Sequence, residues 1–247
     1  MLEGATLQKL RAARRVLALT GAGISAESGV PTFRNAQTGL WAKYRAEELA
    51  TPEAFLDNPR FVWDWYVWRR QLTDIAQPNP GHTALVELAQ RFPEFTLVTQ
   101  NVDGLHARAG SRDVVELHGN ISTTLCFDEG TPVSDFTDDG KTPPRCPSCG
   151  ALLRPGVVWF GESLPRAALA RAERAAETAQ VVLSIGTSSL VQPAAGLPLL
   201  AKRCGALLIE INPSPTPLTP HTDVVLSGPA GQLLPQLLRA LDGENNG

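Results

Sequence analysis

Cysteine, methionine and long apolar runs are scarce in this sequence. Its 247 residues include four cysteines and one methionine, and so few cysteines do not build a disulfide scaffold. No apolar run reaches the roughly 18–20 residues of a membrane-spanning helix, so we expect no membrane partner. The apolar stretch from Val16 to Thr20 also falls short of the roughly 7–15 residues in the core of a signal peptide. We therefore expect a cytoplasmic protein.

An excess of positive charge is absent as well. The chain carries 22 lysines and arginines against 25 aspartates and glutamates, a net charge of −3. Surfaces that bind nucleic acid broadly are strongly basic, so this balance argues against a nucleic-acid partner. Because domains span roughly 100–200 residues, the length suits one large domain or one domain with a small insert.

Short apolar runs alternate with helical patterns along most of the chain. Each run ends in a turn rich in glycine or polar residues, which is typical of buried strands in a parallel sheet. The alternation predicts an α/β fold, and ligands of such sheets bind beyond the carboxyl ends of the strands. The predicted strands cover residues 16–19, 95–99, 181–185, 206–211 and 223–226, and the predicted helices cover residues 2–14, 82–91, 166–178 and 194–203.

Two stretches interrupt this alternation. Residues 35–80 hold four of the five tryptophans and both tyrosines, and we expect a helical insert there. Residues 120–154 hold three of the four cysteines and several prolines, which suits a small loop-rich module. The two inserts are expected to form a small domain, whereas residues 1–34, 81–119 and 155–247 are expected to form the sheet domain.

A glycine-containing turn follows the first predicted strand. The string from Gly21 to Ala26 fits the pattern G-x-G-x-x-[G/A], in which glycines let backbone N–H groups approach a pyrophosphate. A plain strand-to-helix turn is the alternative. The acidic residue expected about 20 positions later is not cleanly present, because Glu47 and Glu48 lie in a helical pattern. The motif indicates a nucleotide site but does not suit an ordinary dehydrogenase.

A longer set of strings is far more specific. GAGISAESGVPTFR at 21–34 resembles the signature of the sirtuins, which are NAD-dependent protein deacylases. The strings TQNVDGLH, ELHG, VVWFGE, GTSS and EIN match that family in the same order, at residues 99–106, 116–119, 157–162, 186–189 and 210–212. The resemblance covers about residues 10–235. It implies a Rossmann-like NAD-binding domain, NAD as a consumed co-substrate, and acylated lysines of proteins as partners.

The resemblance also implies a reaction and a catalytic base. The acyl oxygen of a lysine attacks the anomeric carbon of the nicotinamide ribose, nicotinamide leaves, and a ribose hydroxyl then attacks the acyl carbon. The last step needs a general base, and histidine suits it because its ordinary pKa lies near 6.5. By its place in the ELHG string, that base is His118, whereas His106 is expected to position its loop. The products are nicotinamide, 2′-O-acyl-ADP-ribose and free lysine.

Residues that contact NAD are implied by the same motifs. Asn101 and Asp103 are expected to orient the nicotinamide carboxamide, which offers both donors and acceptors, although turn formation is an alternative role for both. Phe33 and Arg34 are expected in a loop that closes over the ribose. The full implied set is Gly21, Ala22, Gly23, Ala26, Glu27, Thr32, Phe33, Arg34, Gln100, Asn101, Asp103, Gly186, Thr187, Ser188, Asn212, Ser214 and Ala230.

The peptide and its acyl group are expected to meet two further segments. Residues 157–162 and 190–191 resemble the segments that clamp an extended peptide by strand addition, and the implied contacts are Val157, Phe160, Gly161 and Glu162. Tyr66 and Arg69 share one side of a helix, and their spacing resembles the desuccinylase and demalonylase branch, with Ala46 as its small residue. An arginine can hold a carboxylate through two hydrogen bonds. The alternatives are an aromatic core helix in a deacetylase, or an ADP-ribosyltransferase.

Three cysteines have the spacing of a metal site. Cys146 and Cys149 form a C-x-x-C knuckle, and Cys126 precedes them, which favours a structural zinc ion. The family pattern has a second cysteine pair, but position 129 is Glu here, so Glu129, Asp128 or water would complete the shell. A degenerate site is the alternative, and the net charge disfavours a zinc-knuckle nucleic-acid binder. We expect Cys204 to be a packed thiol.

Overall fold

The computed structural model describes residues 4–31, 45–137 and 143–243. Its centre is a six-stranded sheet in the order β3-β2-β1-β6-β7-β8, and every neighbouring pair is parallel. This confirms the α/β class. The strands are β1 Arg15–Thr20, β2 Glu94–Thr99, β3 Val115–Glu116, β6 Val181–Ile185, β7 Leu207–Asn212 and β8 Val224–Ser227.

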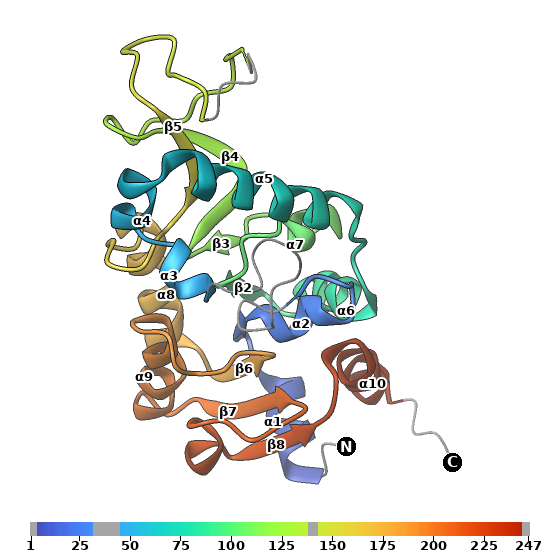
Figure 1. Cartoon of the computed structure of the whole chain (residues 1–247). Helices are drawn as coiled ribbons and strands as arrows, with labels where there is room; N and C mark the ends of the chain where they lie inside the picture. The colour runs from blue at the N-terminus through green and yellow to red at the C-terminus, as the bar shows by residue number, and fades with distance from the viewer. Residues whose placement is uncertain (1–3, 32–44, 138–142, 244–247) are drawn as a thin grey trace.

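Helices cover both faces of this sheet, as Figure 1 shows. Alternate residues of β1 serve different faces, with Ala18 in one apolar cluster and Leu17 in the other. Because both faces are covered, β1 is a nearly continuous apolar run. The first cluster includes residues from α1 Gly4–Ala12, α6 Pro80–Arg91 and α10 Ala230–Asp242, and the second includes residues from α8 Arg166–Thr178 and α9 Leu197–Arg203.

A second, smaller core lies beside the sheet. It joins a two-stranded antiparallel ribbon, β4 Gly119–Cys126 and β5 Leu153–Val157, to three helices: α3 Ala46–Leu49, α4 Pro52–Asp57 and α5 Pro59–Ile75. Figure 1 shows α5 lying across the ribbon, above the six-stranded sheet. The buried side chains of this core include Phe55, Trp65, Tyr66, Ile121 and Trp159. The described part of the tryptophan-rich insert, residues 45–80, is therefore mainly helical, as predicted.

Several boundaries differ from those expected. The predicted helix over 194–203 consists of a 3-10 turn, Ala194–Gly196, followed by α9, which has a proline in its first turn. The ribbon of the cysteine module extends past both predicted ends, from Gly119 to Val157. The remaining short elements are α2 Ala22–Ala26, α7 Leu105–Arg108 and the 3-10 turn Thr219–His221. Within the described ranges, no helix is both long enough and apolar enough to span a membrane.

Candidate active site

The sheet brings the predicted motifs to one edge. Thr20 at the end of β1 pairs in register with Thr99 of β2 and Ile185 of β6, so the strands on either side of β1 end level with it. The order of the strands changes direction at β1. The chain first adds β2 and β3 on one side of β1, and later adds β6, β7 and β8 on the other side. Ligands of open parallel sheets bind in the crevice at such a point. The segments that follow β1, β2, β3, β6 and β7 carry most of the predicted site residues.

The glycine turn after β1 packs directly on the turn after β6. The amide of Gly21 donates to the carbonyl of Ile185 at 3.0 Å, and that of Gly23 donates to the carbonyl of Gly186 at 2.8 Å. A Cβ atom added to Gly23 would lie 2.7 Å from the Cα of Gly186, whose own φ is +58°. Only glycine meets both requirements. Ala22 is half-buried and Ala26 is exposed on α2, which begins in this turn.

Polar side chains link the turns after β2, β6 and β7. Gln100 Nε2 donates to Thr187 Oγ1 at 3.0 Å, and Asn212 Nδ2 donates to the Thr187 carbonyl at 3.2 Å. Ser188 and Ser214 lie nearby in the sequence with exposed side chains. These residues therefore form one continuous polar rim along the carboxyl edge of the sheet.

Glu210 holds the proline-rich loop after β7, a role that its sequence motif did not predict. Its side chain is 1% exposed, yet its carboxylate accepts hydrogen bonds from the hydroxyls of Thr216 and Thr219. A buried carboxylate needs such partners. These hydrogen bonds fix the loop that follows Asn212 and carries Ser214. The signal in the sequence was an acid inside an otherwise apolar strand.

Asn101 and Asp103 lie side by side in the loop after β2, and both are less than a tenth exposed. Asn101 Nδ2 donates to Ser25 Oγ of the glycine turn at 3.1 Å. Asp103 Oδ1 accepts from the Leu105 amide at 2.9 Å, and this bond does not use the second carboxylate oxygen. The predicted turn function and a ligand function are therefore compatible for Asp103.

His118 is held so that one ring nitrogen is fixed. Its Nδ1 lies 3.0 Å from the carbonyl oxygen of Gln100, which can only accept, so Nδ1 carries the proton. The backbone carbonyl of His118 also accepts from the Val158 amide at 2.8 Å. The Nε2 lone pair is left to accept a proton. Burial lowers the pKa of the His118 imidazole, partly opposed by its bond to Gln100, and this keeps the ring neutral near pH 7.

Two buried histidines, His82 and His106, lie beneath this edge, and only His106 was predicted to have a role in the site. His106 Nε2 is 2.9 Å from Thr20 Oγ1, which agrees with its expected positioning role. The ring of His82 lies 4.9 Å from that of His106 and approaches Ser25. His82 sits three residues after Asn79, whose backbone amide donates to its Nδ1. This capping pattern, N-P-x-H, was the available signal in the sequence.

Glu27 and Ala230 meet at the start of α10. Glu27 Oε1 accepts from the Gly231 amide at 2.8 Å, next to the buried Ala230. The carboxylate satisfies one of the free N–H groups in the first turn of that helix. Glu27 therefore ties the glycine turn to α10. The predicted loop residues Thr32, Phe33 and Arg34 lie outside the described residues.

The predicted acyl-binding pair lies on α5, which packs against the ribbon. Tyr66 is 4% exposed, and its hydroxyl accepts from Trp159 Nε1 at 2.9 Å. Burial lowers the pKa of the Arg69 guanidinium, and interactions with Tyr66 and Asp103 oppose that shift. Arg69 is thus close enough to Asp103, in the loop after β2, for their charges to interact. Ala46 belongs to the same buried cluster as Tyr66.

The predicted peptide segment follows β5. Val157 is buried, whereas Phe160 is 40% exposed and Gly161 is exposed beside it with a φ of +89°. Glu162 points back into the turn and pairs with Arg154. An exposed phenylalanine next to a glycine therefore leaves the outer side of this segment accessible.

The cysteine module gathers three thiols. The sulfur atoms of Cys126, Cys146 and Cys149 all lie within 4.8 Å of one another, and Cys126 and Cys149 are 3.4 Å apart. Tetrahedral zinc with bonds of about 2.3 Å would space its sulfurs by roughly 3.8 Å, so the set fits zinc. Glu129 is outside this cluster and accepts from Thr131 Oγ1 at 3.3 Å.

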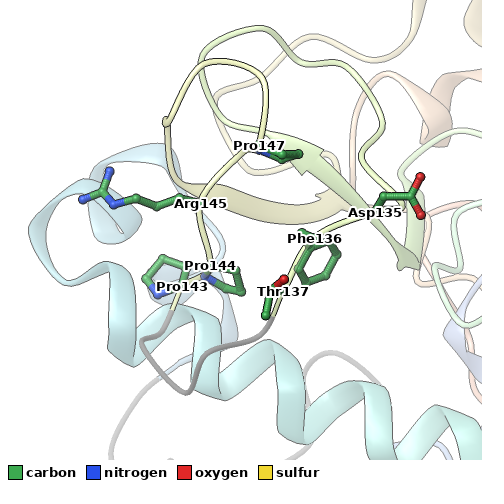
Figure 2. Close-up of a pocket in the computed structure, with 7 residues that line it drawn as sticks. All are labelled: Asp135, Phe136, Thr137, Pro143, Pro144, Arg145 and Pro147. Atoms are coloured by element: carbon green, nitrogen blue, oxygen red, sulfur yellow. The ribbon is translucent and has the colours of Figure 1, made fainter.

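Cys204 is exposed, so the prediction of a packed thiol was wrong. It caps the carboxyl end of α9 just before Gly205, at a surface turn. A cavity of about 820 Å³ lies elsewhere, beside the cysteine knuckle, and none of the predicted site residues lines it (Figure 2). Its lining residues are Asp135, Phe136, Thr137, Pro143, Pro144, Arg145 and Pro147.

Comparisons with known proteins agree with this geometry. The Sir2 family pattern matches residues 21–193. An NAD-dependent protein deacylase of Aquifex aeolicus is 56% identical over 210 residues, covering 85% of this chain and 87% of that protein. A solved Sir2 homologue in complex with NAD is similar with a TM-score of 0.92 and 47% identity, covering 98% of this chain and 95% of that chain. A mutant Sir2 homologue in complex with 2′-O-acetyl ADP ribose gives a TM-score of 0.91 at 47% identity, covering 98% and 97%. This chain therefore belongs to the Sir2 family, the sirtuins.

Proposed function

We propose that this chain removes acyl groups from lysines of proteins with NAD as co-substrate. NAD supplies the ribose that receives the acyl group while nicotinamide leaves. The observation that carries the proposal is the arrangement of His118 beside Gln100, at the edge where the glycine turn and the Asn101 loop converge. The products are nicotinamide, 2′-O-acyl-ADP-ribose and free lysine.

His118 acts as the general base. Its Nδ1 proton is committed to the Gln100 carbonyl, so Nε2 takes the proton of a ribose hydroxyl. A base whose pKa lies below the working pH is already deprotonated when substrate arrives. The carbonyl partner also stabilises the imidazolium that forms, because a protonated ring donates through both nitrogens.

The polar rim of the sheet edge binds NAD. The turn of Gly21, Ala22 and Gly23 approaches the phosphates, although the amides of Gly21 and Gly23 are hydrogen-bonded to β6 and the turn after it. Asn101 and Asp103 hold the nicotinamide carboxamide. Glu27 contributes indirectly. Its carboxylate accepts a hydrogen bond from the Gly231 amide and so ties the start of α10 to the glycine turn. The remaining assigned contacts are Ala26, Gln100, Gly186, Thr187, Ser188, Asn212, Ser214 and Ala230, with Thr32, Phe33 and Arg34 in the segment outside the described residues.

The acyl pocket accepts groups that end in a carboxylate. Arg69 would pair with that carboxylate, and Tyr66 would donate a hydrogen bond beside it. The support is that Tyr66 is buried and Arg69 half-buried on one side of α5, with Arg69 close enough to Asp103 for their charges to interact. We therefore assign succinyl and malonyl groups as substrates together with acetyl. A deacetylase without this preference and an ADP-ribosyltransferase are the alternatives.

The other segments support this chemistry. Val157, Phe160, Gly161 and Glu162 line the path of an extended peptide, which adds to the segment after β5 as a strand. Cys126, Cys146 and Cys149 hold a structural zinc ion, which closes the knuckle and leaves the reaction to the sheet edge. We divide the chain accordingly: residues 1–34, 81–119 and 155–247 form the NAD-binding domain, and residues 35–80 and 120–154 form the small domain.

Mass spectrometry of the products tests the reaction. With NAD and acetyl- or succinyl-lysine peptides, we expect 2′-O-acyl-ADP-ribose and free lysine from the native protein, and neither product from a folded His118→Ala variant. ADP-ribosylated protein without deacylated peptide would instead support the transferase alternative. Deacylation at a normal rate by His118→Ala would remove His118 from its role.

Parallel kinetics test the acyl preference. Charge-assisted hydrogen bonds contribute roughly 1.5–3 kcal/mol, so Arg69→Met should lower kcat/KM for succinyl-lysine by about ten- to a hundredfold. The loss should lie mainly in KM, because the carboxylate is charged before and during the reaction. Deacetylation should fall far less. Arg60→Met, an exposed change on the same helix, is the matched control. Equal losses on both peptides would make Arg69 a structural residue of α5.

A further inference from the structure

The indole N–H of Trp159 donates a hydrogen bond to the hydroxyl of Tyr66, the proposed acyl-binding tyrosine. Trp159 Nε1 lies 2.9 Å from Tyr66 Oη, and the two side chains are 1% and 4% exposed. Tyr66 belongs to α5 and Trp159 to the segment after β5, so the bond joins parts of the chain that are 93 residues apart. The contact therefore ties the acyl pocket to the proposed peptide segment.

Trp159 is itself fixed from two sides. The guanidinium of Arg154 lies 3.5 Å from the centre of the indole ring, over its face. Arg154 also pairs with both carboxylate oxygens of Glu162. Glu162 Oε2 in turn accepts from the Trp159 backbone amide at 2.7 Å. The indole therefore has little freedom to turn away from Tyr66.

The direction of this hydrogen bond constrains the phenol proton. An indole N–H can only donate, so Tyr66 Oη must be the acceptor of this bond. Arg69, one turn along α5, also carries donors alone. Burial raises the pKa of the Tyr66 phenol, so it keeps its proton. Within the part of the chain that the structure describes, no acceptor takes the Tyr66 proton, and an acyl carboxylate bound at Arg69 would accept it.

We propose that Trp159 is a positioning residue for acyl choice, which fixes the Tyr66 hydroxyl as a hydrogen-bond donor toward an acyl carboxylate. The inference rests on the proposed role of Tyr66 and Arg69. The new element is Trp159, a residue outside that pair, which makes the Tyr66 hydroxyl a donor toward the acyl group. A site in which Tyr66 and Arg69 both act as donors selects a group that accepts, and it gains little from a neutral acetyl group.

Selectivity measurements test the proposal. Trp159→Phe keeps an aromatic ring but removes the N–H group. The ratio of kcat/KM for succinyl- to acetyl-lysine peptides should then fall about three- to tenfold, the effect of one neutral hydrogen bond. In a Tyr66→Phe background, the same change should leave that ratio within about twofold, because the acceptor is already gone.

The matched control is Trp63→Phe. Trp63 lies on α5 and is also buried, but its Nε1 has no hydrogen-bond partner among the described residues. Trp63→Phe should leave the ratio of kcat/KM for succinyl- to acetyl-lysine peptides unchanged. An equal loss on both peptides with Trp159→Phe, or an unreduced effect in the Tyr66→Phe background, would overturn the proposal. If Arg69→Met is also unselective, the proposed carboxylate preference fails with it, whereas a selective Arg69→Met isolates the failure to Trp159.

A second measurement does not depend on the Trp159 variant folding. In nitrogen–proton spectra, the chain should give indole N–H signals from its five tryptophans. Tyr66→Phe should shift one of them upfield, as expected when a hydrogen bond is lost, and this signal should differ from the one that disappears in Trp63→Phe. Succinyl-lysine peptide should move the same signal more than acetyl-lysine peptide does. If no such signal responds to Tyr66→Phe, Trp159 does not hold the phenol in solution.

Discussion

Lowering the pH from 7.5 to 5 should destabilise this protein through two buried histidines. His82 Nδ1 accepts from the Asn79 amide, so a proton there would break the helix cap. His106 Nε2 donates to Thr20 Oγ1, whose own proton goes to Thr99. Its Nδ1 is buried without a partner among the described residues, so a proton there would have no acceptor.

The magnitude follows from the shifted pKa values. Burial lowers the pKa of His82 from 6.5 to about 4, and burial together with the neighbouring His82 lowers that of His106 to about 3. Between these values and 6.5 the unfolded chain binds protons that the folded chain does not, so stability falls as the pH falls. At pH 5, about 1.5 units below 6.5, each histidine should cost about 2 kcal/mol. Both together should cost about 4 kcal/mol.

Urea unfolding at pH 7.5 and pH 5, followed by tryptophan fluorescence, measures this loss. His106→Gln keeps a polar side chain but removes one titrating group, so its stability should fall about 2 kcal/mol less than that of the native protein. Comparing the two proteins cancels groups that titrate in both. His221→Gln changes an exposed histidine and is the control. If the native protein and His106→Gln lose the same stability, His106 is not held neutral in the fold.

Two further predictions concern the nicotinamide loop and the cysteine module. Asp103→Asn keeps an oxygen for the Leu105 amide, so the variant should fold normally. It should nevertheless slow the exchange of labelled nicotinamide about ten- to a hundredfold, the effect of losing one charged hydrogen bond. Normal exchange would contradict the assignment of Asp103 to the carboxamide. Elemental analysis of protein prepared without chelator should find about one zinc per chain, because three thiolates are in place. Glu129→Cys, which adds a fourth thiol, should slow the loss of zinc to a chelator, whereas Cys204→Ser, outside the cluster, should not change it. Metal-free protein that is folded and active would contradict the structural role of zinc.

Local sequence patterns determined the strands of the sheet well. A strand buried on both faces is a continuous apolar run, and this signal places β1, β2 and β6 within about one residue. The turns that follow them therefore had to meet at one edge, because parallel strands end on the same side. Cys204 shows the limit of such reasoning. A cysteine between a helix and a strand is expected to be buried, but the end of α9 that carries Cys204 lies at the surface.

Polar partners across the fold lay beyond sequence reasoning. His82 was missed because its capping pattern says nothing of the histidine it would face, which lies in α7. The hydrogen bonds of Glu210 were missed because an acid in an apolar strand has no visible partner until the following loop folds back. Each of these contacts depends on how two separate elements pack.

Local periodicity and spacing were enough to predict the order of the motifs, the parallel sheet and the residue types available for chemistry. Which atom of each residue is free to react depends instead on the packed fold. The carbonyl of Gln100 decides that His118 presents Nε2, and the indole of Trp159 decides which way the Tyr66 hydroxyl points. Such choices depend on directional hydrogen bonds between distant segments, and these exist only after the elements have packed.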